Sequence, residues 1–128
     1  MKIKHTLPFI LATLLVVLAA CSSAEATPEP FPTGKFEAVN DPGMGYAFNE
    51  DGTFGYFFGG TEPVVTGTYT ISGNKLSLVD PEEVDPLCQG EVTYEWSFDG
   101  TNLTFAPTAE DTCRPRADSF AATYKRSE

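Results

Sequence analysis

The chain has 128 residues, about the length of one domain, and its hydrophobic content of 41% and aromatic content of 12% exclude a disordered protein. Its 18 acidic and 8 basic residues give a formal net charge of −10. This balance excludes a nucleic-acid binder, because such a protein needs a basic patch against phosphate.

The first 20 residues have the composition of a signal peptide. Lys2 and Lys4 supply positive charge, and an apolar run follows over residues 7–18. The run is too short to cross a hydrocarbon core, which needs about 20 residues, but it suits the hydrophobic region of an export signal. It ends in Leu18-Ala19-Ala20-Cys21, which resembles the bacterial lipobox. The resemblance implies cleavage before Cys21 and attachment of a diacylglycerol to its sulfur. An ordinary signal peptide followed by a chance cysteine is the alternative.

The lipobox resemblance also implies a location. A lipidated Cys21 anchors a protein to the extracytoplasmic face of a bacterial cell membrane. A serine directly after the lipidated cysteine, here Ser22, resembles the pattern of lipoproteins that are sent to the outer membrane in hosts with two membranes. Without Lys2 and Lys4, residues 21–128 keep 6 basic and 18 acidic residues, a balance of 6 − 18 = −12. Such a surface repels anionic headgroups, so we expect the lipid on Cys21 to hold a monomeric protein to the membrane.

The one histidine, His5, lies within the predicted signal peptide. The mature chain then lacks an imidazole, which excludes Ser-His-Asp catalysis, Cys-His catalysis and histidine-ligated metal sites. We therefore expect a protein that is not an enzyme, with no catalytic residue, cofactor or metal.

Residues 21–33 are predicted to form the lipidated cysteine and a tether. The sequence after Cys21, SSAEATPEPFPT, has Phe31 as its one large apolar side chain and predicts a solvated, partly extended spacer. Residues 34–128 must then supply the whole core, and a domain of that size often recruits a disulfide. With Cys21 lipidated, an oxidising compartment favours a bond between Cys88 and Cys113, with two free thiols as the alternative.

The domain 34–128 alternates apolar and polar residues with a period of two, which predicts antiparallel strands. The clearest case is the segment 91–99, which the Asp99-Gly100 turn joins to a return strand at 102–105. The same pattern predicts strands at 35–39, 44–48, 54–58, 68–71 and 75–78, and a last strand through Phe120, Ala122 and Tyr124 after a short turn at 114–119.

Eight short sequential strands with one apolar face favour an all-β fold, a closed antiparallel up-and-down barrel, with a two-sheet sandwich as the alternative. Three segments carry a family resemblance: Gly34-Lys35-Phe36, GTYTISGNKLSL over 67–78, and YEWSFDGTNLTF over 94–105. They resemble the small lipocalin-like domains of bacterial lipoproteins. This resemblance implies a lipocalin-like barrel over most of residues 34–128.

The predicted inward face is rich in aromatic rings. Six of them are candidates to line a pocket for a small apolar ligand, with tyrosine hydroxyls as polar handles: Phe54, Tyr56, Tyr69, Tyr94, Trp96 and Phe98. Because eight strands enclose little space, the same rings could simply fill the barrel. The first alternative predicts a membrane-anchored binding module. The second predicts an interaction or enzyme-inhibitor protein that contacts an extracytoplasmic partner through the segments 59–66, 80–90 and 107–119.

Charged clusters give weaker signals. The segment 80–86 holds four carboxylates but lacks the spacing and glycine of a calcium loop, so we interpret it as a solvated loop. Glu91 and Glu95 lie four residues apart on one strand face, about 13 Å, too far for a glycosidase pair. Arg114 and Arg116 are expected either to pair with nearby acidic residues, namely Glu110, Asp111 or Asp118, or to contact an anionic ligand.

Overall fold

The computed structural model describes residues 29–81 and 85–128. The predicted signal peptide, the lipidation site Cys21 and most of the predicted tether therefore lie outside the described residues, as do Glu82 and Glu83 of the acidic segment.

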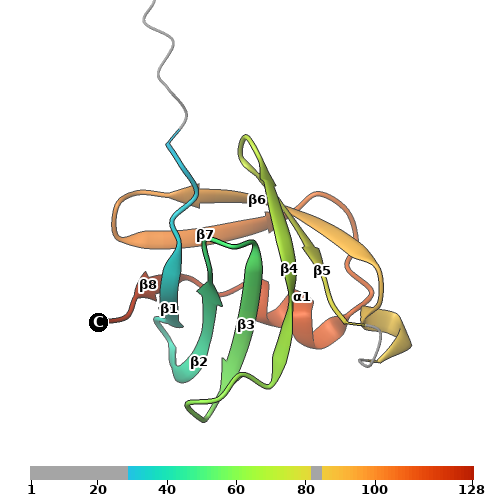
Figure 1. Cartoon of the computed structure of the whole chain (residues 1–128), viewed down its shortest axis with the longest axis horizontal. Helices are drawn as coiled ribbons and strands as arrows, with labels where there is room; N and C mark the ends of the chain where they lie inside the picture. Colours follow the sequence, from blue (N-terminus) through green and yellow to red (C-terminus); the bar gives the residue numbers. More distant parts are fainter. Residues whose placement is uncertain (1–28, 82–84) are drawn as a thin grey trace, which may run out of the picture.

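Eight antiparallel strands form a closed barrel in simple sequence order (Figure 1). Each strand pairs with the next, and β1 pairs with β8 through Phe36 with Arg126, Glu37 with Lys125 and Ala38 with Tyr124. The prediction of an up-and-down barrel is confirmed, and the sandwich alternative is wrong. The strands are β1 (Gly34–Ala38), β2 (Asp41–Phe48), β3 (Thr53–Phe58), β4 (Val65–Ser72), β5 (Lys75–Val79), β6 (Glu91–Phe98), β7 (Asn102–Pro107) and β8 (Tyr124–Arg126).

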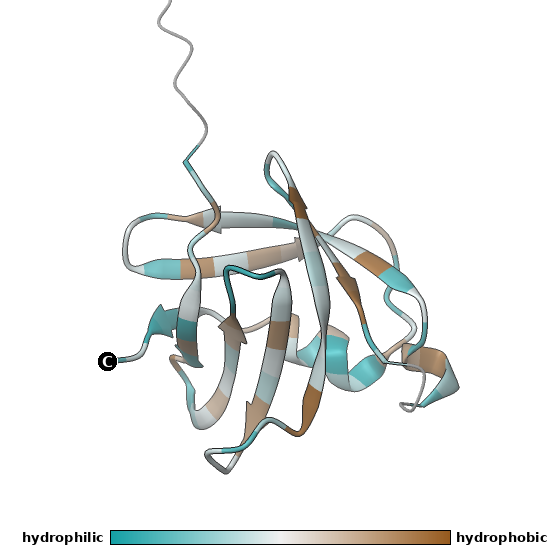
Figure 2. Ribbon diagram, viewed as in Figure 1, coloured by the Kyte–Doolittle hydropathy of each residue, from teal (hydrophilic) through white to brown (hydrophobic). Residues whose placement is uncertain are grey.

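Hydrophobic and hydrophilic residues follow one another along the strands (Figure 2), and successive side chains of a strand point to opposite faces. In β6, Tyr94 and Trp96 are buried while Glu95 and Ser97 are exposed. The β6–β7 turn follows from the Asp99-Gly100 pair. The Asp99 carboxylate accepts hydrogen bonds from the backbone N–H groups of Thr101 and Asn102, and Gly100 adopts a φ of 94° that favours glycine.

The two ends of the barrel are closed differently. The connections after β1, β3, β5 and β7 lie at one end, which we name the α1 end because it carries the helix α1 (Arg114–Phe120) and the short 3₁₀ helix η1 (Pro86–Cys88). Short hairpin turns lie at the other end. There residues 29–33, which we name the strap, meet the barrel, so we name it the strap end.

The strap differs from the solvated spacer expected for residues 22–33. The Phe31 ring is partly buried and packs against the core, and Pro32 is buried. Burial of a large apolar side chain from a polar segment lowers the free energy, and the rings of Phe48, Tyr69 and Trp96 offer it a contact surface.

The final segment also differs from the expected strand through Phe120, Ala122 and Tyr124. Phe120 is the last residue of α1, and β8 begins only at Tyr124. Pro115 occupies the first turn of α1, where it suits a helix start. Arg116, Ser119 and Phe120 are the buried residues of this helix, a spacing that places them on one helical face. Within residues 29–81 and 85–128, no helix is long and apolar enough to cross a membrane.

Candidate functional site

The six candidate ligand-lining residues all belong to the core. Phe54, Tyr69, Tyr94 and Trp96 are buried, and Tyr56 and Phe98 are partly buried and packed against them. Sequence reasoning thus located the face on which these rings lie. It did not show whether space remains between them.

Aromatic rings fill the middle of the barrel. Phe120, which α1 inserts from the α1 end, stacks on Tyr94 with ring centroids 4.4 Å apart and contacts Tyr46 at 4.8 Å and Phe105 at 4.6 Å. The Tyr46 ring also contacts four others: Phe48, Phe54, Tyr56 and Tyr124. Rings at these separations are in direct contact, so aromatic side chains pack against one another across the middle of the barrel.

A small pocket of about 200 Å³ remains at the α1 end. Tyr46, Tyr56 and Val65 form its barrel side, and Pro115 and the disulfide lie on its other side. The predicted bond between Cys88 and Cys113 is confirmed, and both cysteines are buried. The pocket is partly open to solvent and mostly apolar, so it can admit a small apolar group.

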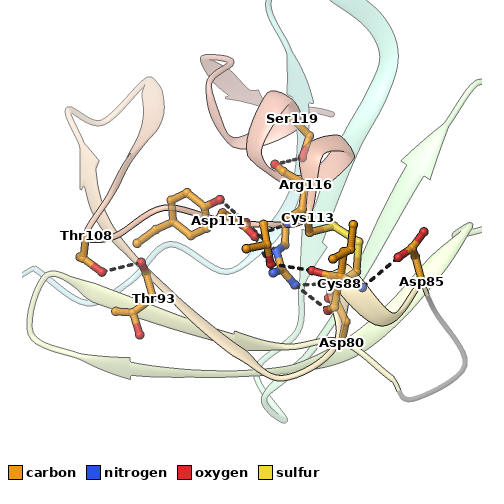
Figure 3. A network of polar contacts seen from close by, with 12 residues as sticks. Asp80, Asp85, Cys88, Thr93, Thr108, Asp111, Cys113, Arg116 and Ser119 are labelled. Carbon is orange, nitrogen blue, oxygen red and sulfur yellow. Dashed lines mark hydrogen bonds and ion pairs between the residues drawn. A yellow bond between two sulfur atoms is a disulfide. The ribbon is translucent and has the colours of Figure 1, made fainter.

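A buried polar network supports this pocket (Figure 3). Arg116 donates from Nη1 to Asp80 at 2.7 Å and to the Cys88 carbonyl at 3.1 Å, and from Nε and Nη2 to the two carboxylate oxygens of Asp111 at 2.8 and 2.7 Å. Asp111 also accepts from the Tyr94 hydroxyl at 2.5 Å and the Cys113 N–H at 2.9 Å. The network therefore joins α1, β6 and the segments on both sides of the disulfide.

The electrostatics follow from one cation placed between two carboxylates. Burial acts to raise the pKa of Asp111, but hydrogen bonds from Arg116 and Tyr94 outweigh it and lower that pKa. Burial raises the pKa of Asp80, and the Arg116 charge offsets this only in part. Burial likewise raises the pKa of Tyr94, and its hydrogen bond to Asp111 raises it further. All four of these Arg116 hydrogen bonds go to protein acceptors, so Arg116 has a structural role in the network.

The expected pairing of Arg116 with Asp111 is therefore present, while its second partner, Asp80, was not expected. Asp80 is 36 residues away in sequence, and local spacing carries no signal for such a contact. Among the residues that the structure describes, the ion pairs are these two, so neither Arg114 nor Glu110 nor Asp118 forms one.

The other acidic candidates do not come together. Asp85 accepts a hydrogen bond from the Leu87 N–H and caps η1, and Glu91 and Glu95 are exposed on β6 opposite Val79 and Lys75. Outside 1–28 and 82–84, no group of acidic, histidine or cysteine side chains is arranged to hold a metal ion.

Apolar side chains are exposed mainly at the α1 end. Across the described ranges there are six exposed large hydrophobic residues, and five lie at or beside the α1-end connections: Val39, Phe58, Val64, Val79 and Leu87. The sixth, Ile71, lies toward the strap end of β4. Phe58 and Leu87 are each 63% exposed, the highest fractions among these six residues.

Comparison of the chain with protein-family models, with curated proteins and with solved structures found no match.

Proposed function

We propose that this chain is a lipid-anchored extracytoplasmic protein of bacteria that acts without catalysis, as an interaction module for another protein. The observation that carries the proposal is the packed interior, in which Phe120 occupies the space between Tyr46, Tyr94 and Phe105. A packed barrel has its surface available for binding. Binding residues on such scaffolds commonly lie in the segments that connect the strands.

The binding surface in this proposal is the α1 end. Phe58, Val64 and Leu87 supply exposed apolar area there, and the 200 Å³ pocket offers a place for one apolar side chain of the partner. Buried anchors of this kind carry much of the affinity at protein interfaces. Because residues 21–128 have a charge balance of 6 − 18 = −12, the partner in this proposal is a basic protein.

The anchoring part of the proposal rests on the lipobox resemblance at Leu18 to Cys21. The strap enters the barrel at the end opposite to α1 (Figure 1). An anchor on Cys21 would therefore leave the α1 end free to face away from the membrane, where a soluble partner can reach it.

A small apolar ligand is the second candidate, because the 200 Å³ pocket is mostly apolar. Pockets for drug-sized ligands occupy about 300–1,000 Å³, so this pocket suits only a small group such as one ring or a short branched chain. Tyr56 is the one candidate ligand-lining residue that contributes to it.

The test compares crosslinked partners of three forms of the protein in membranes of its host. The double variant Phe58→Asp with Leu87→Asp places two charges on the proposed surface, and the double variant Thr68→Asp with Ser97→Asp places two charges on exposed positions of the barrel wall. The proposal predicts that one basic partner is lost with the Phe58 and Leu87 double variant and retained with the Thr68 and Ser97 double variant. Retention of every partner by the Phe58 and Leu87 double variant would overturn it.

Two further measurements test the small-ligand alternative and the lipid anchor separately. Native mass spectrometry showing one stoichiometric small molecule, displaced when Val65→Trp fills the pocket, would favour the second candidate over a protein partner. Independently, Cys21→Ser should move the protein from the membrane fraction to the soluble extracytoplasmic fraction. An unchanged membrane fraction would contradict the lipid anchor alone.

A further inference from the structure

Another pocket, which we name the β7 pocket, is lined by residues of both β7 and α1. Its volume is about 410 Å³, within the range of about 300–1,000 Å³ that small-molecule sites occupy. Three aromatic residues line it, Tyr94, Phe105 and Phe120, together with Ala117 and Ala121 of α1. Among the described residues, none lines both this pocket and the 200 Å³ pocket beside the disulfide. The β7 pocket is therefore a separate space with a mostly apolar wall.

The pocket lies where the barrel wall is incomplete. β6 pairs with β7 as far as Pro107, whereas β8 pairs with β7 only at Asn102 and Leu103. The chain before β8 folds as α1 and does not lengthen β8. The part of β7 beyond Leu103 consequently has a neighbouring strand on one side only.

Phe105 has unpaired backbone groups on this open side of β7. Alternate residues of an antiparallel strand direct their N–H and C=O groups to opposite neighbours. The Thr108 N–H bonds to Thr93 on the β6 side, so Phe105, an odd number of residues away, directs its groups away from β6. β8 has ended there, and no other segment of the described chain makes a hydrogen bond to the Phe105 N–H or carbonyl. Because Phe105 is partly buried, an occupant that pairs with this donor and this acceptor is favoured.

Two side chains of opposite charge line the same pocket. Arg114 and Glu110 are exposed, and neither forms an ion pair with another residue that the structure describes. The third charged lining residue, Asp111, already accepts two hydrogen bonds from Arg116 and one from Tyr94. One positive and one negative charge therefore remain for a ligand, and a ligand with a single charge would match only one of them.

We propose that the β7 pocket binds a free α-amino acid with an apolar side chain. Arg114 and the Phe105 N–H hold its carboxylate, and Glu110 and the Phe105 carbonyl hold its ammonium group. The apolar side chain lies against the aromatic and alanine residues of the wall. Each end of the zwitterion thus has one charged partner and one backbone partner, and such charge-assisted hydrogen bonds are the strong ones. This site does not depend on the protein partner proposed for the α1 end.

The experiment titrates the purified full chain with L-phenylalanine and measures affinity by calorimetry and by the NMR cross-peak of the Phe105 amide. Two analogues each lack one charge: hydrocinnamate has the ring and the carboxylate, and phenethylamine has the ring and the ammonium group. L-phenylalanine should bind saturably. Each analogue should bind about tenfold or more weakly, because it loses a hydrogen bond to a charged group.

Two charge variants assign the ends of the ligand. Arg114→Gln should weaken the binding of L-phenylalanine about tenfold without weakening that of phenethylamine. Glu110→Gln should weaken the binding of L-phenylalanine similarly without weakening that of hydrocinnamate. The matched controls Lys125→Gln and Asp118→Asn change exposed charges that do not line the pocket, and they should bind all three compounds as the wild type does.

Two tryptophan variants test the location. Ala121→Trp should fill the pocket and abolish binding, whereas Ala106→Trp, at an exposed position of β7 outside the pocket, should not. Val65→Trp fills the 200 Å³ pocket and should leave the binding of L-phenylalanine intact, which separates this site from the small-ligand candidate above. Three results would overturn the proposal: no saturable binding of L-phenylalanine by the folded protein, equal affinity for L-phenylalanine and both analogues, or unchanged affinity in folded Ala121→Trp protein.

Discussion

The guanidinium of Arg116 and the carboxylate of Asp80 form a 2.7 Å ion pair in which the two side chains are only 8% and 7% exposed. The pair joins α1 to the residue that follows β5. A buried ion pair adds little net stability compared with apolar packing, but removing one partner leaves the other charge buried and unpaired. This contact therefore fixes how α1 closes its end of the barrel.

Arg116→Leu should lower the free energy of unfolding by about 3–5 kcal/mol, because it leaves Asp80 and Asp111 without their cation. Arg114→Leu, two residues earlier on an exposed position, should change it by no more than about 0.5 kcal/mol. Urea unfolding of both variants measures the difference. Equal effects of the two substitutions would contradict the role assigned to the network.

Acid should affect the two carboxylates in opposite directions. The pKa of Asp111 is lowered in the fold, so its contribution to stability is present above its ordinary value of 3.8 and is lost as the pH falls through the folded value. The pKa of Asp80 is raised, so its contribution is present at low pH and is lost as the pH rises through the folded value. The difference in unfolding free energy between wild type and Asp111→Asn should thus shrink on acidification. On acidification, the unfolding free energy of the wild type should rise relative to that of Asp80→Asn. Parallel curves of unfolding free energy against pH for all three proteins would refute these roles of Asp80 and Asp111.

Alkaline titration should be delayed for all five tyrosines. Burial is the largest cause that raises the pKa of each one: Tyr46, Tyr56, Tyr69, Tyr94 and Tyr124. Because the folded state favours the neutral phenol, the tyrosines' contribution to stability is intact below about pH 10. It is lost as the pH rises through the pKa values that the tyrosines have in the folded protein. Tyrosinate absorption should therefore appear together with loss of the far-ultraviolet dichroism of the barrel. Ionisation near pH 10 in protein that stays folded is the contrary result.

Reduction of the Cys88–Cys113 bond should lower the free energy of unfolding by about 3.5 kcal/mol, the loop-closure value for the chain that it encloses. Cys21→Ser protein, unfolded in urea with and without a reductant, isolates this bond because it leaves no third thiol. A double Cys88→Ser and Cys113→Ser variant should match the reduced protein. No loss of stability on reduction would contradict the expectation.

Gly45→Ala should destabilise the barrel by about 1–3 kcal/mol, because a Cβ at that position would lie 2.5 Å from the Phe36 carbonyl oxygen of the neighbouring strand. Gly60 has nothing within 4 Å of such a Cβ, so Gly60→Ala is a matched control that should be neutral or slightly stabilising. Thermal unfolding compares them. A similar melting temperature for both variants would show that β1 and β2 can separate without cost.

The sequence pattern was sufficient for the barrel because its information is local. Alternation in 91–98 fixes which side of β6 is inward, the Asp99-Gly100 turn sets the next register, and a chain of such hairpins has a closed sheet as its favoured arrangement. The disulfide was likewise predictable, since two cysteines remained in the domain once Cys21 had been assigned to the lipid.

The contacts that the sequence did not predict are the ones made after closure. Asp80 meets Arg116 only because the β5–β6 connection and α1 share one barrel end, and Phe31 reaches Trp96 only because β2, β4 and β6 bring their rings together. Phe120 is different, because a local signal existed. Arg116, Ser119 and Phe120 have helical spacing after Pro115, but the alternation of Phe120, Ala122 and Tyr124 suggested a strand instead.

The position of Phe31 has a mechanical consequence. The seam that closes the barrel is thin, with three paired positions between β1 and β8 and two between β7 and β8. A force applied through the amino-terminal segment would act directly on β1 if the chain passed straight into that strand. Instead it first meets the Phe31 ring contacts and the Arg126–Thr33 hydrogen bond. The strap therefore bears the first part of any pull on the tether, and the seam between β1 and β8 is loaded only after the strap has come away.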